Sequence, residues 1–174
     1  MAGATPHPRT DRPETVTLHA AFCRVAAAAR LLLLAALAVA VTACSADESR
    51  GILHTATGDY PFSIEIADDG AERAQGLMFR QTLAPDAGML FDYFEEDDVS
   101  FWMRNTLIPL DMVFISADGV VKSIHVNARP LDPTSISSQG PVRFVLEIPG
   151  GRSVEIGLKP GDTFEHVRVK RAEE

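Results

Sequence analysis

Sulfur and aromatic side chains gather in the middle of this 174-residue chain, around its single tryptophan. Soft thioether ligands suit Cu(I), and an imidazole can complete such a site. A copper site would use Met78, Met89, Met103 and His125, close to Trp102. Methionines also fill irregular gaps in hydrophobic cores, and the apolar neighbours of these residues have the pattern of a core. The residue types therefore leave open a periplasmic Cu(I)-binding protein and a methionine-rich core.

Polar side chains interrupt two otherwise apolar stretches, one expected on a helix and one following Trp102. Ligand pockets are mostly apolar with a few placed polar groups, and the mouths of β-barrels are common sites. The candidate ligand-binding residues are Arg73, Arg80, Trp102, Arg104, Asn105 and Asp111. Such a pocket would suit a small anionic or polar compound. In the alternative interpretation Asp111 pairs with Arg73 or Arg104, and Asn105 and Thr106 satisfy the backbone of a turn.

Signatures of common enzyme classes are missing from the sequence. It contains no Gly-x-Ser-x-Gly elbow, no phosphate-binding glycine loop and no His-Glu-x-x-His motif. The histidines after the N-terminal segment, His54, His125 and His166, are scattered, so a zinc site would need carboxylates supplied by the fold. A hydrolase could use Asp111 and His125, which flank one predicted hairpin, although such pairs are more often structural. Catalysis stays open but is less favoured than binding.

The charge balance argues against one class of partner. Residues 45–174 contain 12 Lys and Arg against 22 Asp and Glu, a balance of −10. A phosphate backbone would be repelled by that surface, so nucleic acid is not an expected partner. The acidic run Glu95–Asp98 lacks the alternating spacing of a calcium loop and is expected to be a solvated loop tip. We expect a monomer that requires no cofactor.

Short runs of β-branched and aromatic residues predict a mostly-β fold. Phe62, Ile64 and Ile66 alternate with polar residues, as in a half-buried strand. Asp118-Gly119 between apolar runs is a hairpin signal. The expected strands are Gly51–Thr57, Phe62–Ala67, Gly88–Phe91, Val99–Met103, Met112–Ser116, Val120–Val126, Val142–Ile148, Ser153–Gly157 and Phe164–Lys170. Many short strands at regular spacing predict a single small β-barrel, closed or nearly closed.

One short α-helix is expected in this barrel. Asp69, followed three residues later by Glu72, has the spacing of a helix start, because these side chains can bond the free N–H groups there. The helix would cover Ala71 to Phe79, with Leu77 and Met78 on its inner face.

The N-terminal segment predicts export. Arg24 and Arg30 precede an apolar run, Leu31 to Val41, that is too short to cross a bilayer core of ~30 Å and fits a signal peptide. The following Val41–Cys44 resembles a bacterial lipobox, in which Cys44 would receive the lipid. The alternative is cleavage after Ala43, which would leave a soluble periplasmic protein. Because the other cysteine, Cys23, also lies in this segment, no disulfide framework is expected.

These features predict a simple domain organisation. Residues 1–44 form the signal peptide, 45–50 a polar tether, and 51–171 a single β-rich domain. A lipid at Cys44 would anchor the protein to a membrane from the periplasm. Ser45 stands where an aspartate commonly retains lipoproteins at the inner membrane, so the outer membrane is slightly favoured by resemblance.

Several stretches together carry a family resemblance. They are Glu72–Arg80, Gly88–Phe91, Phe101–Met112, Val145–Glu147 and Gly161-Asp162. The chain resembles the uncharacterised family named domain of unknown function 192, from about Ile52 to Val169. The resemblance implies a small, mostly-β domain, found in bacteria and archaea and often behind a signal peptide. It implies no reaction.

The sequence thus favours an exported, non-enzymatic module of the cell envelope that binds a small ligand or a partner protein. Its binding surface would join the helical segment Arg73–Arg80 to the segment Trp102–Asp111. Copper binding is the second hypothesis, and hydrolysis the third.

Overall fold

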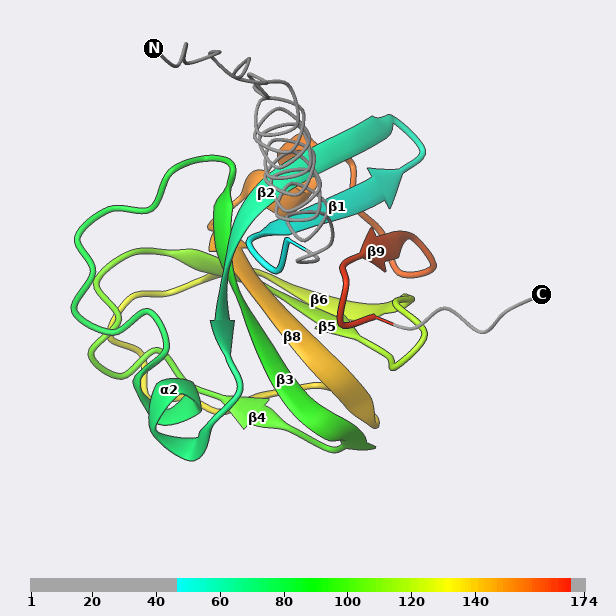
Figure 1. The fold of residues 1–174 in the computed structure, drawn as a ribbon. Coiled ribbons are helices and arrows are strands. Elements are labelled where there is room, and N and C mark those ends of the chain that lie inside the picture. Colours follow the sequence, from blue (N-terminus) through cyan, green and yellow to red (C-terminus); the bar gives the residue numbers. More distant parts are fainter. Residues whose placement is uncertain (1–46, 170–174) are drawn as a thin grey trace, which may run out of the picture. The chain divides into compact units, whose positions relative to one another are not determined.

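The structure, a computed structural model, describes residues 47–169; the predicted signal peptide and Cys44 lie outside the described residues. Seven strands form one sheet in the order β6-β5-β8-β3-β2-β1-β9, and β4 pairs with β7 (Figure 1). The strands are β1 (Arg50–Thr55), β2 (Gly58–Ala67), β3 (Ala87–Asp97), β4 (Ser100–Phe101), β5 (Leu110–Ile115), β6 (Val121–Ala128), β7 (Ile136–Ser137), β8 (Val142–Pro149) and β9 (Thr163–Glu165). Within this part of the chain, no helix is long and apolar enough to cross a bilayer.

The seven-stranded sheet curls into an open half-barrel. Its strand pairs are antiparallel except β2 with β3, which is parallel. Between its two ends, the described residues make one isolated bridge, Val120 with Thr163, and a few backbone hydrogen bonds such as Phe164 N–H to Gly119 O at 2.8 Å. The mostly-β, barrel-like prediction is confirmed, but closure of the barrel is wrong. The last strand, β9, has three residues, too few to form a full ladder with β6.

Helix α2 (Gly70–Gln75) begins where the sequence predicts. Asp69 Oδ1 accepts hydrogen bonds from the N–H groups of Ala71 and Glu72, each at 2.8 Å, and Glu72 completes a capping box. The helix ends at Gly76, whose positive φ of 47° turns the chain, so the predicted end at Phe79 is wrong. A Cβ at Gly76 would lie 3.1 Å from the Phe91 ring, so glycine also allows a close approach to β3.

A second short helix, α3 (Arg152–Glu155), stands where the sequence predicts a strand. Gly151 adopts a left-handed conformation (φ 87°) before it, and Ser153 gives its N–H and hydroxyl to the buried carboxylate of Asp111. These contacts hold the segment in a helical turn against β5, so the strand Ser153–Gly157 and the expectation of a single helix are both wrong.

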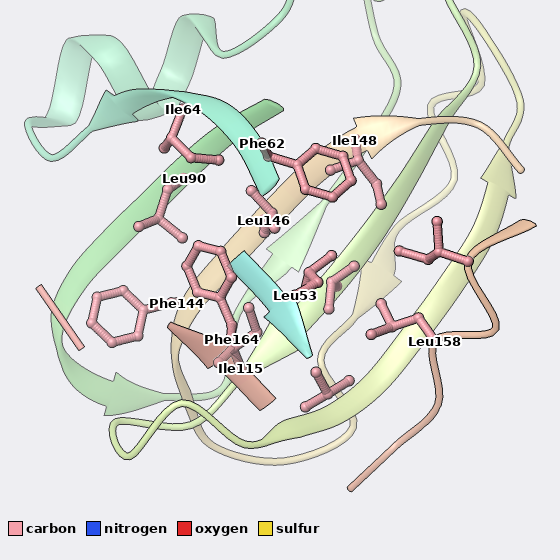
Figure 2. Close-up of a cluster of buried hydrophobic side chains, with 13 residues drawn as sticks. Leu53, Phe62, Ile64, Leu90, Ile115, Phe144, Leu146, Ile148, Leu158 and Phe164 are labelled. Atoms are coloured by element: carbon pink, nitrogen blue, oxygen red, sulfur yellow. The ribbon is translucent and has the colours of Figure 1, made fainter. Parts of the chain in front are cut away.

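The sheet has a hydrophobic cluster on each face. Figure 2 shows the first, where side chains of β1, β2, β3, β5, β8 and β9 converge, among them Leu53, Leu146 and Phe164. The second cluster contains Met89, Met103 and Met112 together with Phe91, Phe101 and Phe114. Neighbouring residues of β8 divide between the faces, since Leu146 belongs to the first cluster and Val145 to the second. Three of the four methionines in residues 47–169 are therefore core residues, as the alternative to copper binding predicts.

Candidate functional site

A cavity of about 240 Å³ lies between two segments of the chain. One segment is α2 with the residues that follow it, and the other is β4 with the residues that follow it. One wall contains Arg73, Gly76 and Met78, and the other contains Phe101, Trp102 and Thr106. We call this cavity the Trp102 pocket. The structure thus brings together the two segments that the sequence singles out, although strand β3 lies between them along the chain.

Glu147 of β8 lies at the floor of the Trp102 pocket. Met89 of β3 and Met112 of β5 are its partners in register, so the carboxylate projects from the centre of the sheet on the face of the second cluster. Glu147 is only 5% exposed, and within residues 47–169 its side chain has no hydrogen bond or ion pair. Burial alone raises the pKa of this carboxyl to about 8. A Cβ at Gly76 would lie 4.0 Å from Glu147 Oε2, so the glycine leaves space beside the carboxylate.

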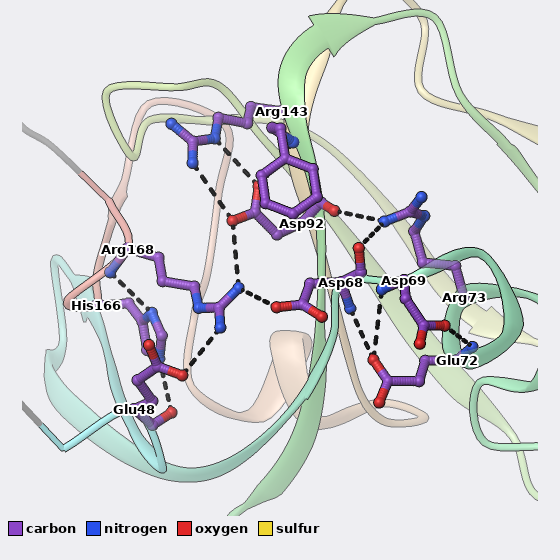
Figure 3. A network of polar contacts seen from close by, with 10 residues as sticks. Glu48, Asp68, Asp69, Glu72, Arg73, Asp92, Arg143, His166 and Arg168 are labelled. Carbon is purple, nitrogen blue, oxygen red and sulfur yellow. Dashed lines mark hydrogen bonds and ion pairs between the residues drawn. The ribbon is translucent and has the colours of Figure 1, made fainter.

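Arg73 and Tyr93 line the pocket from α2 and β3. Figure 3 shows Arg73 Nη1 donating to the backbone carbonyls of Asp68 (2.5 Å) and Asp92 (3.0 Å). Its guanidinium lies 5.2 Å from the centre of the Tyr93 ring. Burial raises the pKa of the Tyr93 hydroxyl; Arg73 opposes this rise, and Glu147 adds to it. Arg73 therefore fastens α2 to β3 and places a positive charge near the pocket.

The opposite wall is held by Asn105. Its backbone carbonyl accepts the Phe79 N–H at 2.8 Å, and its side-chain amide lies 3.8 Å from Met78 Sδ. Asn105 has a positive φ of 61°, a conformation that asparagine tolerates better than most residues. Trp102 is half exposed, and the Arg104 guanidinium lies 5.5 Å from its ring centre. Asn105 thus positions the wall, while the Trp102 side chain faces both pocket and solvent.

Arg80 lies outside the Trp102 pocket. It forms a two-pronged ion pair with Glu65, at 2.5 and 2.6 Å, beside a separate surface cavity that Met89 also lines. The hydrogen bond from Arg80 lowers the pKa of the Glu65 carboxyl. This pair has the geometry of a surface ion pair, and it separates Arg80 from the other predicted binding residues.

Asp111 is fully buried. It pairs in register with Ile148 of the first cluster, so its side chain lies on the face of the sheet opposite to Glu147. Its two oxygens accept four hydrogen bonds. The donors are Asn127 N (2.7 Å), Gly151 N (2.7 Å), Ser153 N (2.7 Å) and Ser153 Oγ (2.5 Å). The predicted ion pair with Arg73 or Arg104 is therefore wrong: Asp111 joins β5, β6 and α3.

The residues of the copper hypothesis line different cavities. Met78 lines the Trp102 pocket, Met89 borders the cavity beside Arg80, and Met103 and His125 border a third cavity of about 400 Å³. In residues 47–169, no three His, Cys, Asp or Glu side chains are arranged to hold a metal ion. His125 also pairs with Met112, on the face opposite Asp111. The structure therefore assembles neither the four proposed copper ligands nor the Asp111–His125 pair.

A network of charges on the sheet encloses a third buried carboxylate, Asp92 (Figure 3). Arg143 donates to both of its oxygens, at 3.1 and 3.3 Å. Arg168 bonds Asp68 at 2.6 Å and Glu48 at 2.9 Å, and these acceptors raise the pKa of its guanidinium. The network joins the first and last described segments to β2 and β3, and it leaves Asp92 well partnered.

Comparison with known proteins identifies the family. The model of DUF192, described as "Uncharacterized ACR", matches residues 52–166, more than half of the chain. The chain belongs to the DUF192 family. No curated protein matches it significantly.

Two crystal structures resemble this DUF192 domain closely. One, described as a candidate transcription regulator from Sinorhizobium meliloti 1021, is 44% identical, with a TM-score of 0.68; the match covers 72% of this chain and 98% of that one. The other is a protein of unknown function from Novosphingobium aromaticivorans DSM 12444. It is 43% identical, with a TM-score of 0.65, and the match covers 67% of this chain and 83% of that one.

Glu147 and Tyr93 of the Trp102 pocket are not among the binding residues predicted from the sequence, and Thr106 was predicted only to satisfy the backbone of a turn. For Glu147 a signal was available. The strand Val142–Pro149 is apolar on both faces near its centre, and Glu147 is the carboxylate inside that apolar run. A charged residue at such a position must have a partner, a raised pKa or a function.

Proposed function

We propose that this DUF192 protein is a non-enzymatic module of the cell envelope that binds a small ligand in the Trp102 pocket. The observation that carries the proposal is the Glu147 carboxylate, which lies buried on the pocket floor without a partner among the described residues. Buried polar groups in folded proteins are almost always hydrogen-bonded, because desolvation without a partner is costly. A ligand that supplies the missing partner would bind there.

The other two hypotheses have less support. Copper binding would need side chains that line three different cavities, and the hydrolase pair projects from opposite faces of the sheet. The charge balance of −10 in residues 45–174 disfavours nucleic acid. A small-ligand pocket is the arrangement that uses the two segments brought together by the fold.

The proposed location in the envelope comes from the N-terminal sequence. A lipid on Cys44 would hold the domain at a membrane. Of the predicted tether 45–50, Glu48 is bonded by Arg168 and Arg50 begins β1, so the domain starts closer to Cys44 than the sequence predicts. Membrane fractionation of cells that produce the wild type or Cys44→Ser tests the lipid anchor. We expect the wild type in the membrane fraction in a processed form, and Cys44→Ser in a soluble or unprocessed form; if the two proteins are the same in both processing and distribution, lipidation is contradicted.

Ligand binding is tested by thermal unfolding of the purified protein with a panel of small envelope metabolites. A ligand at 100 times its dissociation constant stabilises by about 2.7 kcal/mol, which moves the midpoint by several degrees. Ala74→Phe should abolish the shift, because the exposed Ala74 lines the pocket. Ala71→Phe, on the same helix but outside the pocket, is the matched control. A panel without any shift, or a shift that survives Ala74→Phe, would overturn the proposed site.

A further inference from the structure

We propose that the ligand of the Trp102 pocket carries a primary ammonium group, which the Glu147 carboxylate receives as its counter-ion. This inference rests on the proposed function and names the chemical class of the ligand. It comes from the set of groups that line the pocket and from the partners that they lack.

The lining offers further hydrogen-bond acceptors besides Glu147. Thr106, which is only 5% exposed, and the exposed Ser100 both line the cavity, and each carries a hydroxyl. Within residues 47–169, neither hydroxyl and neither oxygen of Glu147 has a side-chain hydrogen bond. An ammonium ion carries three donors and no acceptor, so it can satisfy a carboxylate and two hydroxyls together. A quaternary ammonium or an alcohol would leave most of these acceptors unpaired.

Aromatic rings complete a site for a cation. Phe91, Tyr93, Phe101 and Trp102 all line the cavity. The faces of such rings attract cations, and the attraction is stronger when the site is desolvated. The Arg73 and Arg104 guanidinium groups already contact Tyr93 and Trp102, whereas Phe91 and Phe101 have no cation against their rings among the described residues. A volume of about 240 Å³ restricts the ligand to a small amine.

Binding should be coupled to a proton. The described side chains against Glu147 are Met89 and Met112 on the neighbouring strands, with Tyr93 and Arg73 as the titratable or charged groups of the lining. Arg73 bonds backbone carbonyls and makes no ion pair with Glu147 in the described chain. Because the pKa of the empty carboxyl is raised to about 8, an ammonium must displace its proton at neutral pH. Affinity should therefore rise by up to tenfold per pH unit below about pH 8.

The test compares n-butylammonium chloride with 1-butanol, its neutral analogue of similar size, and with tetramethylammonium. Trp102, the only tryptophan in the chain, reports binding through its fluorescence, and calorimetry measures the proton released. We expect n-butylammonium to bind at least tenfold more tightly than either comparison compound, and more tightly at pH 8 than at about pH 6. An alkylamine of this kind stays charged over that range, like the lysine side chain.

Glu147→Gln keeps the shape of the side chain and removes the charge. It should lose the preference for n-butylammonium and its pH dependence, whereas Glu95→Gln, at an exposed carboxylate of β3, should keep both. Circular dichroism verifies that the variants fold. Absence of n-butylammonium binding up to about 100 mM, equal binding of 1-butanol, or full binding by Glu147→Gln would each overturn the inference. If an uncharged metabolite shifts the wild type but not Ala74→Phe, the proposed function stands and the ammonium inference fails.

Discussion

Asp111 and Glu147 are buried carboxylates on adjacent central strands, and they project from opposite faces of the same sheet. Asp111 accepts four hydrogen bonds from β6 and from the segment around α3. Glu147 accepts none from the described residues and opens into a cavity. The difference shows that burial of a charged group does not by itself identify a functional site. The hydrogen-bond partners of the carboxylate decide whether it stabilises the fold or is free to bind a ligand.

The largest expected effect comes from removing the partnered carboxylate. Asp111→Ala would leave the N–H groups of Asn127, Gly151 and Ser153 without their acceptor, the last of them buried, and it should lower the free energy of unfolding by about 3–5 kcal/mol. Urea unfolding measures this. Asp86→Ala, at an exposed aspartate, is the control and should change stability little. A loss below about 1 kcal/mol for Asp111→Ala would show that the network is not structural.

Glu147 should make the protein less stable as pH rises, whereas a carboxylate in an ordinary ion pair makes a protein more stable as pH rises. Folded Glu147 keeps its proton up to about pH 8, whereas the unfolded residue releases it near the ordinary value of 4.5. Between these values the folded state binds more protons, so stability falls as pH rises, by ~5 kcal/mol at most.

Glu147→Gln isolates this contribution from that of the other titrating groups. Relative to the wild type, the variant should gain stability between about pH 5 and pH 8, and the gain should then level off. Urea unfolding of both proteins over this range provides the measurement. A constant difference across the range would show that Glu147 ionises normally in the folded protein.

An exposed carboxylate with hydrogen bonds provides an intermediate case. Asp69→Ala removes the cap of α2 and should cost about 1 kcal/mol. Since α2 forms a wall of the Trp102 pocket, n-butylammonium binding should weaken as well. Asp69→Asn retains an acceptor and should recover most of the thermal midpoint. If the alanine variant matches the wild type in both properties, the cap does not position the wall.

The smallest effect is expected at the Arg80–Glu65 pair. Both side chains are substantially exposed, at 34% and 52%, and such pairs contribute about 0–1 kcal/mol. Arg80→Ala should therefore lower the thermal midpoint only slightly and leave binding in the Trp102 pocket unchanged. A clear loss of n-butylammonium binding would show that Arg80 belongs to the binding site, as the sequence predicts.

Local patterns in the sequence were sufficient for much of the fold. Alternation at Phe62, Ile64 and Ile66 predicts β2, and the spacing of Asp69 and Glu72 predicts the start of α2. The errors arise where distant residues decide. Asp111, far along the chain, holds Ser153 in a helical turn. Helix α2 ends early at Gly76, whose positive φ turns the chain where it lies close to the Phe91 ring. Such long-range contacts override local propensity.

The candidate site could be predicted only in part, for the same reason. The polar residues in the Arg73 and Trp102 segments predicted that these segments form one site, and both line the Trp102 pocket. The face occupied by Asp111, in contrast, depends on strand register. A shift of one residue in register would exchange the two faces of β5. Glu147 stands out in the sequence as a carboxylate inside an apolar strand, but its lack of a partner is visible only in three dimensions.

The central claim is that Glu147 is a buried carboxyl without a protein partner, and a direct titration tests it. The ¹³C chemical shift of the Glu147 side-chain carboxyl, assigned by comparison with Glu147→Gln, can be followed by NMR against pH. The account predicts a pKa of about 8 for the protein without ligand, and a lower value once n-butylammonium is bound. A midpoint near 4.5 in the free protein would contradict the account, because it would mean that the carboxylate is already solvated or paired.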